Sequence, residues 1–207
     1  MLEVAKAMIA EGGPEGFTIR ELGRRAKVSV TTIYATYGDK EGLIAAAIQD
    51  YYDRLSVANV QPSLGLSGVL KATDQVRDAI LANKAYARQY AYLYFSSTVD
   101  PRIYKVIRDT ATASAGHLPW LQKAMRDGDV IPGLEVDAIV TLLANHRLMV
   151  LFDWAQGRIP DDDLHHATKI AFLMFARGIT CGPTQARVEV ELRKLARASH
   201  GRVGDAA

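Results

Sequence analysis

Cysteine is nearly absent from this sequence of 207 residues, in which Cys181 is the only one. An internal disulfide is therefore excluded, and a single thiol fits a reducing cytoplasm. A strong charge of one sign is also missing, because the formal net charge is only +2 at pH 7. Any basic surface that attracts nucleic acid has to be local. The first residues show neither the basic region nor the apolar run of a signal peptide, so we expect a cytoplasmic protein.

Long apolar runs and enzyme motifs are lacking as well. The most apolar stretch, residues 138–155, is interrupted by Asn145, His146 and Arg147, which favours a buried helix over a membrane span. The sequence contains no Gly-rich phosphate loop, no GxSxG and no HExxH motif, and its candidate acid–base residues are scattered. We therefore expect neither a membrane protein nor an enzyme, and no cofactor.

Strand-like alternation is also missing, and apolar residues recur with a helical period nearly throughout, which predicts an all-α protein. Gly and Pro residues punctuate this pattern and set the expected ends of the helices. A stretch with Pro62, Gly65 and Gly68, residues 61–68, reads as a linker between a domain of residues 1–55 and a larger one of residues 56–207. Helices are expected at 1–10, 18–26, 29–36, 40–55, 68–83, 84–97, 101–127, 134–157, 161–180 and 184–199.

Residues 18–40, TIRELGRRAKVSVTTIYATYGDK, are the most informative segment. Thr18 with Glu21 three residues later forms a capping box, and Ser29 is a second N-cap after a turn of three residues. Gly23 falls where two such helices would cross, so a side chain there would hold them apart. This spacing is that of a helix-turn-helix, whose second helix enters the DNA major groove.

The second helix of this unit begins with short side chains that can meet base edges without forcing the helix out of the groove. Later residues and Lys40, at the start of the next helix, would face phosphates. The segment also has five basic against two acidic residues. A small helical domain with a solvated basic face is the alternative, since two-helix corners occur in unrelated folds. The expected DNA contacts are Thr18, Lys27, Ser29, Val30, Thr31, Thr32, Tyr34, Thr36, Tyr37 and Lys40.

The first fifty residues combine an opening helix, its glycine stop, two capped helices and the start of a fourth. These features are carried by Ala5, Ile9, Gly13, Thr18, Arg20-Glu21-Leu22, Ala26, Val28-Ser29, Thr32-Ile33-Tyr34, Tyr37, Asp39-Lys40-Glu41 and Leu43-Ile44. In this combination the segment resembles the N-terminal domain of the TetR family, while the remainder is similar in size and helical character only. The resemblance implies a homodimeric, nucleoid-associated regulator, typically a repressor that a small-molecule effector releases from palindromic operator DNA.

The segment departs from the family pattern at several positions. The family usually has Gly in place of Lys27, and a left-handed backbone there costs a non-glycine residue roughly 1–2 kcal/mol. It often has Gly at Thr31 and a basic residue or His near Ala35 and Thr36, so base readout is expected to depend less on Arg and Lys here. Because Met1 falls inside the first helix, we expect the natural reading frame to begin upstream with a basic arm.

The helices expected at 134–157 and 161–180 are apolar on more than one face, so each must be buried on two sides. One side can be a second copy of the chain, which predicts a homodimer through residues 134–180 with a four-helix interface, as the resemblance also implies. Phe172 and Phe175 are candidates to face the partner. The alternative is an internal helix pair with no partner.

Three tyrosines at i, i+4 and i+8 lie on one stripe of the helix expected at 84–97. Phenol rings on one face can line a pocket for a small hydrophobic or aromatic effector, although aromatic stripes are as often core. The expected ligand contacts are Tyr86, Tyr90, Tyr94, Tyr104, His117, Trp120 and His146.

Three acids followed by two histidines, Asp161 to His166, form i, i+4 pairs of possible metal ligands. Acids in the first turn of a helix offset its dipole and cap free N–H groups, and this explanation is the stronger, so no metal is expected. A dimeric helical protein that binds small molecules or acts as an adaptor without binding DNA stays open as an alternative function.

Overall fold

The computed structural model describes residues 1–16, 18–57, 65–113 and 117–203. Within these residues the chain is helical apart from one isolated β-bridge between Val130 and Thr180, which confirms the all-α prediction. The α-helices are α1 (Leu2–Gly12), α2 (Ile19–Ala26), α3 (Val30–Tyr37), α4 (Lys40–Val57), α5 (Leu66–Ala82), α6 (Lys84–Phe95), α7 (Pro101–Ala113), α8 (Leu118–Arg126), α9 (Val136–Ala155), α10 (Leu164–Ile179) and α11 (Gly182–Val203), with a short 3-10 helix, η1 (Asp161–Asp163), before α10.

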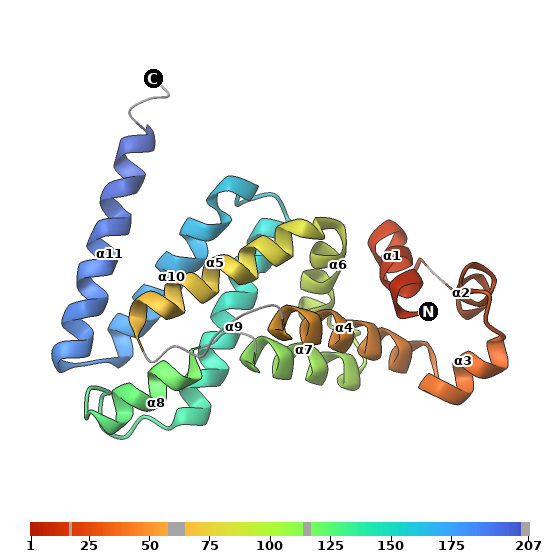
Figure 1. The fold of residues 1–207 in the computed structure, drawn as a ribbon, viewed down its shortest axis with the longest axis horizontal. Coiled ribbons are helices and arrows are strands. Elements are labelled where there is room, and N and C mark those ends of the chain that lie inside the picture. Colours follow the sequence, from red (N-terminus) through yellow and green to blue (C-terminus); the bar gives the residue numbers. More distant parts are fainter. Residues whose placement is uncertain (17, 58–64, 114–116, 204–207) are drawn as a thin grey trace.

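Figure 1 shows α1, α2 and α3 at one end of the molecule, with α4 leading from them into a larger body of helices. One hydrophobic cluster runs from Leu22 and Ile33 in the small end to Tyr90 and Trp154 in the body. A second cluster surrounds Phe172 at the far end. The small end is thus packed onto the body by α1 and α4, and the domain boundary at residue 55 stays a prediction.

One helix expected from the sequence is two helices in the structure. The segment 101–127 was expected to be continuous, but α7 ends at Ala113 and α8 begins at Leu118. Pro119 occupies the first turn of α8, where a missing N–H and a fixed φ do no harm, whereas a proline in a helix interior would break it. The linker predicted at residues 61–68 ends earlier than expected, because α5 begins at Leu66. Residues 61–64 of this predicted linker lie outside the described residues.

By length and composition alone α9 could cross a membrane, with a mean hydropathy of 1.2 over its most apolar window. It packs against α6, α7 and α10, and Arg147 near its middle is turned inward onto the carbonyl of Ala111. A charged side chain directed into the protein is a feature of a core helix, which agrees with the sequence-based expectation.

Candidate DNA-binding surface and ligand cavity

The helix starts around the turn are fixed by side-chain caps. The hydroxyl oxygen of Thr18 accepts a hydrogen bond from the Glu21 N–H at 3.2 Å, and that of Ser29 accepts one from the Thr32 N–H at 3.0 Å. Asp39 caps α4 by accepting from the Gly42 N–H at 2.7 Å. The N-caps predicted at Thr18 and Ser29 are therefore confirmed, and together with Asp39 they set where α2, α3 and α4 begin.

The basic surplus of this region is partly neutralised. The carboxylate of Glu21 accepts hydrogen bonds from Arg24 at 2.6 Å and from Arg25 at 2.7 Å, and these bonds, Arg24 first, lower its pKa to about 2. Arg25 also binds Glu11 of α1 at 2.8 Å. Both arginines are thus engaged with acids of their own chain, which leaves Lys27 among the more available cations of this surface.

The turn between α2 and α3 depends on two backbone features. A Cβ on Gly23 would lie 2.8 Å from the carbonyl oxygen of Val28, so the close approach of the two helices requires glycine. Lys27 is left-handed, with φ 55° and ψ 42°, and is the only non-glycine with positive φ among the described residues. Its N–H caps α2 on the carbonyl of Gly23. The tight crossing expected at Gly23 is confirmed, and Lys27 keeps the left-handed backbone for which the family usually has Gly.

Lys27→Gly is expected to stabilise the protein, because glycine adopts the left-handed conformation without steric cost. The gain of about 1 kcal/mol corresponds to a melting temperature raised by about 2–4 °C for a chain of this length. Thermal unfolding followed by circular dichroism measures it. Lys27→Asn is the intermediate control, since asparagine tolerates the left-handed region better than lysine. A lower melting temperature for Lys27→Gly would contradict the strain at this position.

Helix α3 presents most of its surface to solvent. Ile33 is its one buried residue, whereas Tyr34 keeps 48% of its surface exposed. The hydroxyl of Thr32 lies 2.8 Å from that of Ser29. Among the described residues, the hydroxyls of Thr31 and Tyr34 make no hydrogen bond, so they are free to bind another molecule.

All ten residues expected to contact DNA lie between the start of α2 and the first turn of α4. Eight of them are exposed, while Tyr37 and Lys40 are half-buried. Their contacts with DNA stay a prediction.

An ion pair ties this region to the body of the protein. The guanidinium of Arg102, in α7, donates to the Asp39 carboxylate at 2.9 Å and to Asp100 at 3.0 Å. The bond from Arg102 is the main cause that lowers the pKa of Asp39. The N-cap residue of α4 is thus linked to α7, and no local sequence pattern indicates this contact because the partners lie 63 positions apart.

A cavity lies among five helices of the body, with walls from α4, α5, α7, α9 and α10 and from His117 just before α8. Its free volume is about 40 Å³. This is room for a few water molecules or a small chemical group, far below the roughly 300–1,000 Å³ of a typical pocket for a drug-sized ligand. The wall residues are Tyr52, Thr73, Val76, Arg77, Ile80, Ala111, His117, Arg147, Leu148, Leu151, Leu164, Thr168 and Phe172.

Of the seven residues expected to contact a ligand, His117 alone lines this cavity. The tyrosine stripe of α6 is instead covered by neighbouring helices. Tyr86 packs edge-on against Tyr51 and Tyr90 packs against Tyr52, both on α4, with ring centroids 5.0 Å apart in each pair. Burial raises the pKa of Tyr90 to about 12. These rings join α6 to α4, so they lie one layer behind the cavity wall.

The other expected ligand contacts are also elsewhere. Tyr104 stacks on Tyr94, whose hydroxyl donates to Asn145 at 2.6 Å. Trp120 packs against Phe172 in the second cluster, and His146 is exposed beside Phe175. The structure therefore assigns the cavity to a set of residues that mostly differs from the predicted one.

Several polar groups in the cavity wall lack hydrogen-bond partners among the described residues. Arg147 donates to the Ala111 carbonyl at 2.8 Å, and burial lowers its pKa. Both ring nitrogens of His117 are buried without a hydrogen bond, and burial, reinforced by Arg147, holds its pKa well below 6.5. The Nε of Arg77 is likewise buried without a partner.

The acids of η1 have structural partners. Asp161 accepts a hydrogen bond from the indole of Trp154 at 2.8 Å and from Lys84 of α6. The described residues include no group of three acids, histidines or cysteines arranged to hold a metal ion.

Comparison with known proteins points to one family. Residues 1–47 match the sequence model of "Bacterial regulatory proteins, tetR family". No curated protein matches the whole sequence significantly.

Solved structures share the fold at low sequence identity. A TetR-family regulator from Syntrophomonas wolfei is 14% identical, with a TM-score of 0.66, over 84% of this chain and 92% of that one. The regulator FadR from Bacillus subtilis, solved with stearoyl-CoA, is 14% identical, with a TM-score of 0.65, over 86% of this chain and 97% of that one. A TetR-family regulator from Shewanella sp. PV-4 is 14% identical, with a TM-score of 0.61, over 87% of this chain and 96% of that one. Residues 1–47 thus match the model of the tetR family, and the chain has the fold of TetR-family transcriptional regulators.

Proposed function

We propose that the chain is a cytoplasmic, homodimeric repressor that a small, largely apolar ligand releases from a palindromic operator. The observation that carries the DNA-binding part is α3, a helix with one buried side chain, Ile33, and most of its surface presented to solvent. A helix in a protein core would bury a whole stripe. A major-groove reader instead needs an exposed helix with a rigid N-cap, which Ser29 supplies.

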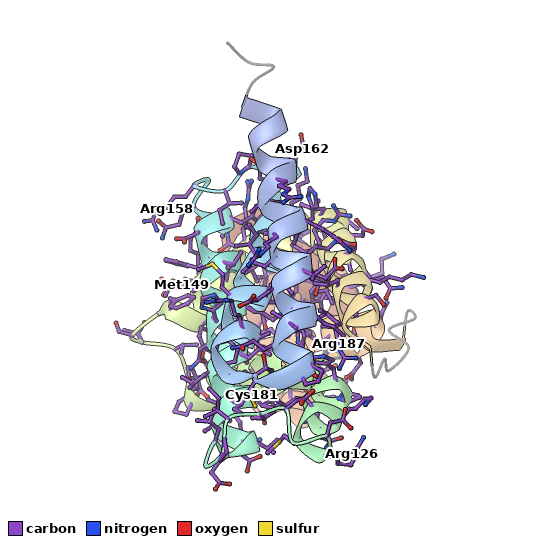
Figure 2. All side chains as sticks on the ribbon, turned by 90° about the vertical axis from the view of Figure 1, so that its left-hand side faces the viewer. Arg126, Met149, Arg158, Asp162, Cys181 and Arg187 are labelled. Atoms are coloured by element: carbon purple, nitrogen blue, oxygen red, sulfur yellow. The ribbon has the colours of Figure 1, made fainter. Side chains whose placement is uncertain are left out.

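The homodimer is supported by apolar side chains left open on neighbouring helices. Leu142 and Met149 of α9 are 58% and 48% exposed, and Met174 of α10 is 61% exposed, although α9 and α10 pack together. Figure 2 labels Met149 on the flank of α9. Large apolar side chains exposed on two helices that pack together are typical of a protein interface. Phe172, expected from the sequence to face the partner, is instead buried within its own chain against Trp120.

The coupling of ligand and DNA follows from α4. Its Tyr52 lines the cavity, while its first turn follows α3 and is tied to α7 through Asp39 and Arg102. Because the free volume is only about 40 Å³, a larger ligand has to push the cavity walls, α4 among them, apart. A tilt of α4 changes the spacing of the two α3 helices in the dimer. A coupling of about 1–3 kcal/mol would weaken operator binding roughly 5–150-fold.

The test is a gel shift with the DNA that flanks the protein's own gene. Specific, salt-sensitive binding to two half-sites about one helical turn apart is expected. Thr31→Ala is expected to weaken binding about tenfold or more, because each subunit loses an exposed hydroxyl without an internal partner. Thr98→Ala is the matched control, since Thr98 is an exposed threonine between α6 and α7, outside the residues expected to contact DNA.

Equal effects of the two threonine substitutions would contradict the placement of α3 in the groove. Binding to no specific DNA at all would favour the alternative of a helical ligand-binding or adaptor protein.

A further inference from the structure

The cavity wall carries positive charge and no negative charge. Two arginines and one histidine line it, and none of its other wall residues is an acid. The remaining lining is mostly aliphatic, from Val76, Ile80 and three leucines of α9 and α10. Cations on the wall of a mostly apolar cavity are unusual, because burying a charge without a counter-charge is unfavourable.

Arg147 is the central case. Its only protein hydrogen bond is to the carbonyl of Ala111, a neutral acceptor, and it forms no ion pair with any acid of the described residues. A guanidinium has five N–H donors, so one carbonyl leaves most of them for another acceptor. The side chain is half-buried and turned into the protein, and burial lowers the pKa of its guanidinium.

His117 and Arg77 add two further unsatisfied groups to the same wall. Neither ring nitrogen of His117 has a hydrogen-bond partner, and its ring is held flat against Phe172 at 4.5 Å between centroids. Arg77 pairs with the exposed Asp78 at 2.7 Å through one terminal nitrogen, while its Nε stays buried and unpartnered. Buried polar groups are almost always satisfied, so the unpartnered nitrogens of His117 and Arg77, beside the largely unused donors of Arg147, indicate a missing acceptor.

The chain does not supply that acceptor from its own acids nearby. Asp74 of α5 is held by Lys169 of α10 at 2.6 Å, and Asp50 of α4 is held by Lys6 of α1 at 2.7 Å. Neither carboxylate lines the cavity. The group that completes the site therefore comes from outside the chain.

We propose that this cavity binds the carboxylate of an amphipathic acid, with Arg147 and His117 holding the head group and the aliphatic wall residues holding the tail. This inference rests on the proposed function and specifies the chemical class of its effector. A carboxylate offers the planar pair of acceptors that matches a guanidinium, and it is compact enough for a free volume of about 40 Å³. The tail exceeds that volume, so it is the part that moves the walls.

The experiment compares two probes that differ only in head-group charge, octanoate and its neutral amide, octanamide. Isothermal titration calorimetry on the full-length protein at pH 7 gives both affinities. Octanoate is expected to bind about tenfold or more tightly, as a charge-assisted hydrogen bond outweighs a neutral one. Equal binding of the two probes, or binding of neither, overturns the proposal.

Arg147→Met removes the charge at similar length, and it is expected to bring the two affinities to within about twofold of each other. Arg126→Met is the matched control, because Arg126 is exposed at the end of α8, away from the cavity wall (Figure 2). The control is expected to keep the full preference for octanoate. A preference that survives Arg147→Met, or that Arg126→Met abolishes equally, overturns the assignment.

A second variant guards against misfolding of the first. His117→Leu removes two ring nitrogens that have no partner, so the fold loses no hydrogen bond, and the preference for octanoate is expected to fall severalfold. An unchanged preference overturns the role of His117. Operator binding without ligand is measured in parallel. If the wild-type protein binds operator but does not prefer octanoate, this inference alone is overturned. If it prefers octanoate but does not bind operator, only the proposed function is overturned.

Discussion

Met174→Glu is expected to convert the protein into a monomer at micromolar concentration. Met174 is the most exposed of the large apolar side chains, at 61%, and lies on the α9–α10 face that we assign to the partner. In the dimer each copy of the substitution would bury a carboxylate without a counter-charge. A penalty of about 3–5 kcal/mol for each buried charge corresponds to a dimer dissociation constant raised about a thousandfold or more.

Operator binding is expected to fail with the dimer, because a single half-site supplies only half of the phosphate and base contacts. Sedimentation velocity gives the mass, and a gel shift gives the affinity. Val190→Glu is the matched control, since Val190 is 51% exposed but belongs to α11, outside the α9–α10 face. A Met174→Glu protein that sediments as a dimer would place the interface elsewhere. Dissociation caused equally by Val190→Glu would extend the interface to α11.

The structure at the N-terminal end was predictable because its signals are local. A short side chain whose oxygen accepts from the N–H three residues later caps a helix, and Thr18, Ser29 and Asp39 all do so. The glycine at position 23 and the left-handed Lys27 follow from a turn of three residues between two helices. Each of these features depends on neighbours within about six positions in the chain.

The ligand cavity was less predictable because it depends on partners distant in sequence. An aromatic stripe such as Tyr86, Tyr90 and Tyr94 shows that one face of α6 is covered, and only the packing reveals that α4 helps to cover it with its own tyrosines. Arg147 and His146 are neighbours that both interrupt an apolar helix. A rotation of 100° between them turns Arg147 into the cavity and leaves His146 exposed.

The same limit applies to the dimer face. An apolar pattern all round α10 predicted that a partner covers one side of the helix, and Phe172 and Phe175 were the candidates to face that partner. Phe172 packs against His117 and Trp120 within the chain, and Met174 points away from it. Hydrophobicity identifies a buried residue but not the molecule that buries it, so the choice of Phe172 for the dimer face was wrong.

Gly23→Ala is expected to weaken operator binding about a hundredfold or more, while the same substitution at Gly12 leaves binding unchanged. At position 23 the added Cβ meets the carbonyl oxygen of Val28 at 2.8 Å, and backbone has to move. At Gly12, the last residue of α1, a Cβ meets no atom within 4 Å. Gly12→Ala is therefore expected to stabilise the protein by about 0.5–1 kcal/mol through its better helix propensity.

We expect Gly23→Ala to displace α3 rather than α2, because α3 is held by the fewest buried side chains where the two helices cross. Ile33 is its one buried side chain, so α3 can shift away from α2 with a loss of about 1–3 kcal/mol, or a melting temperature only a few degrees lower. Such a shift displaces Thr31 and Tyr34 from base edges in both half-sites, and the losses in the two half-sites add. Melting curves and gel shifts on the two variants separate these effects. A Gly23→Ala protein with wild-type operator affinity would show that the crossing of α2 and α3 does not set the position of the DNA-reading surface.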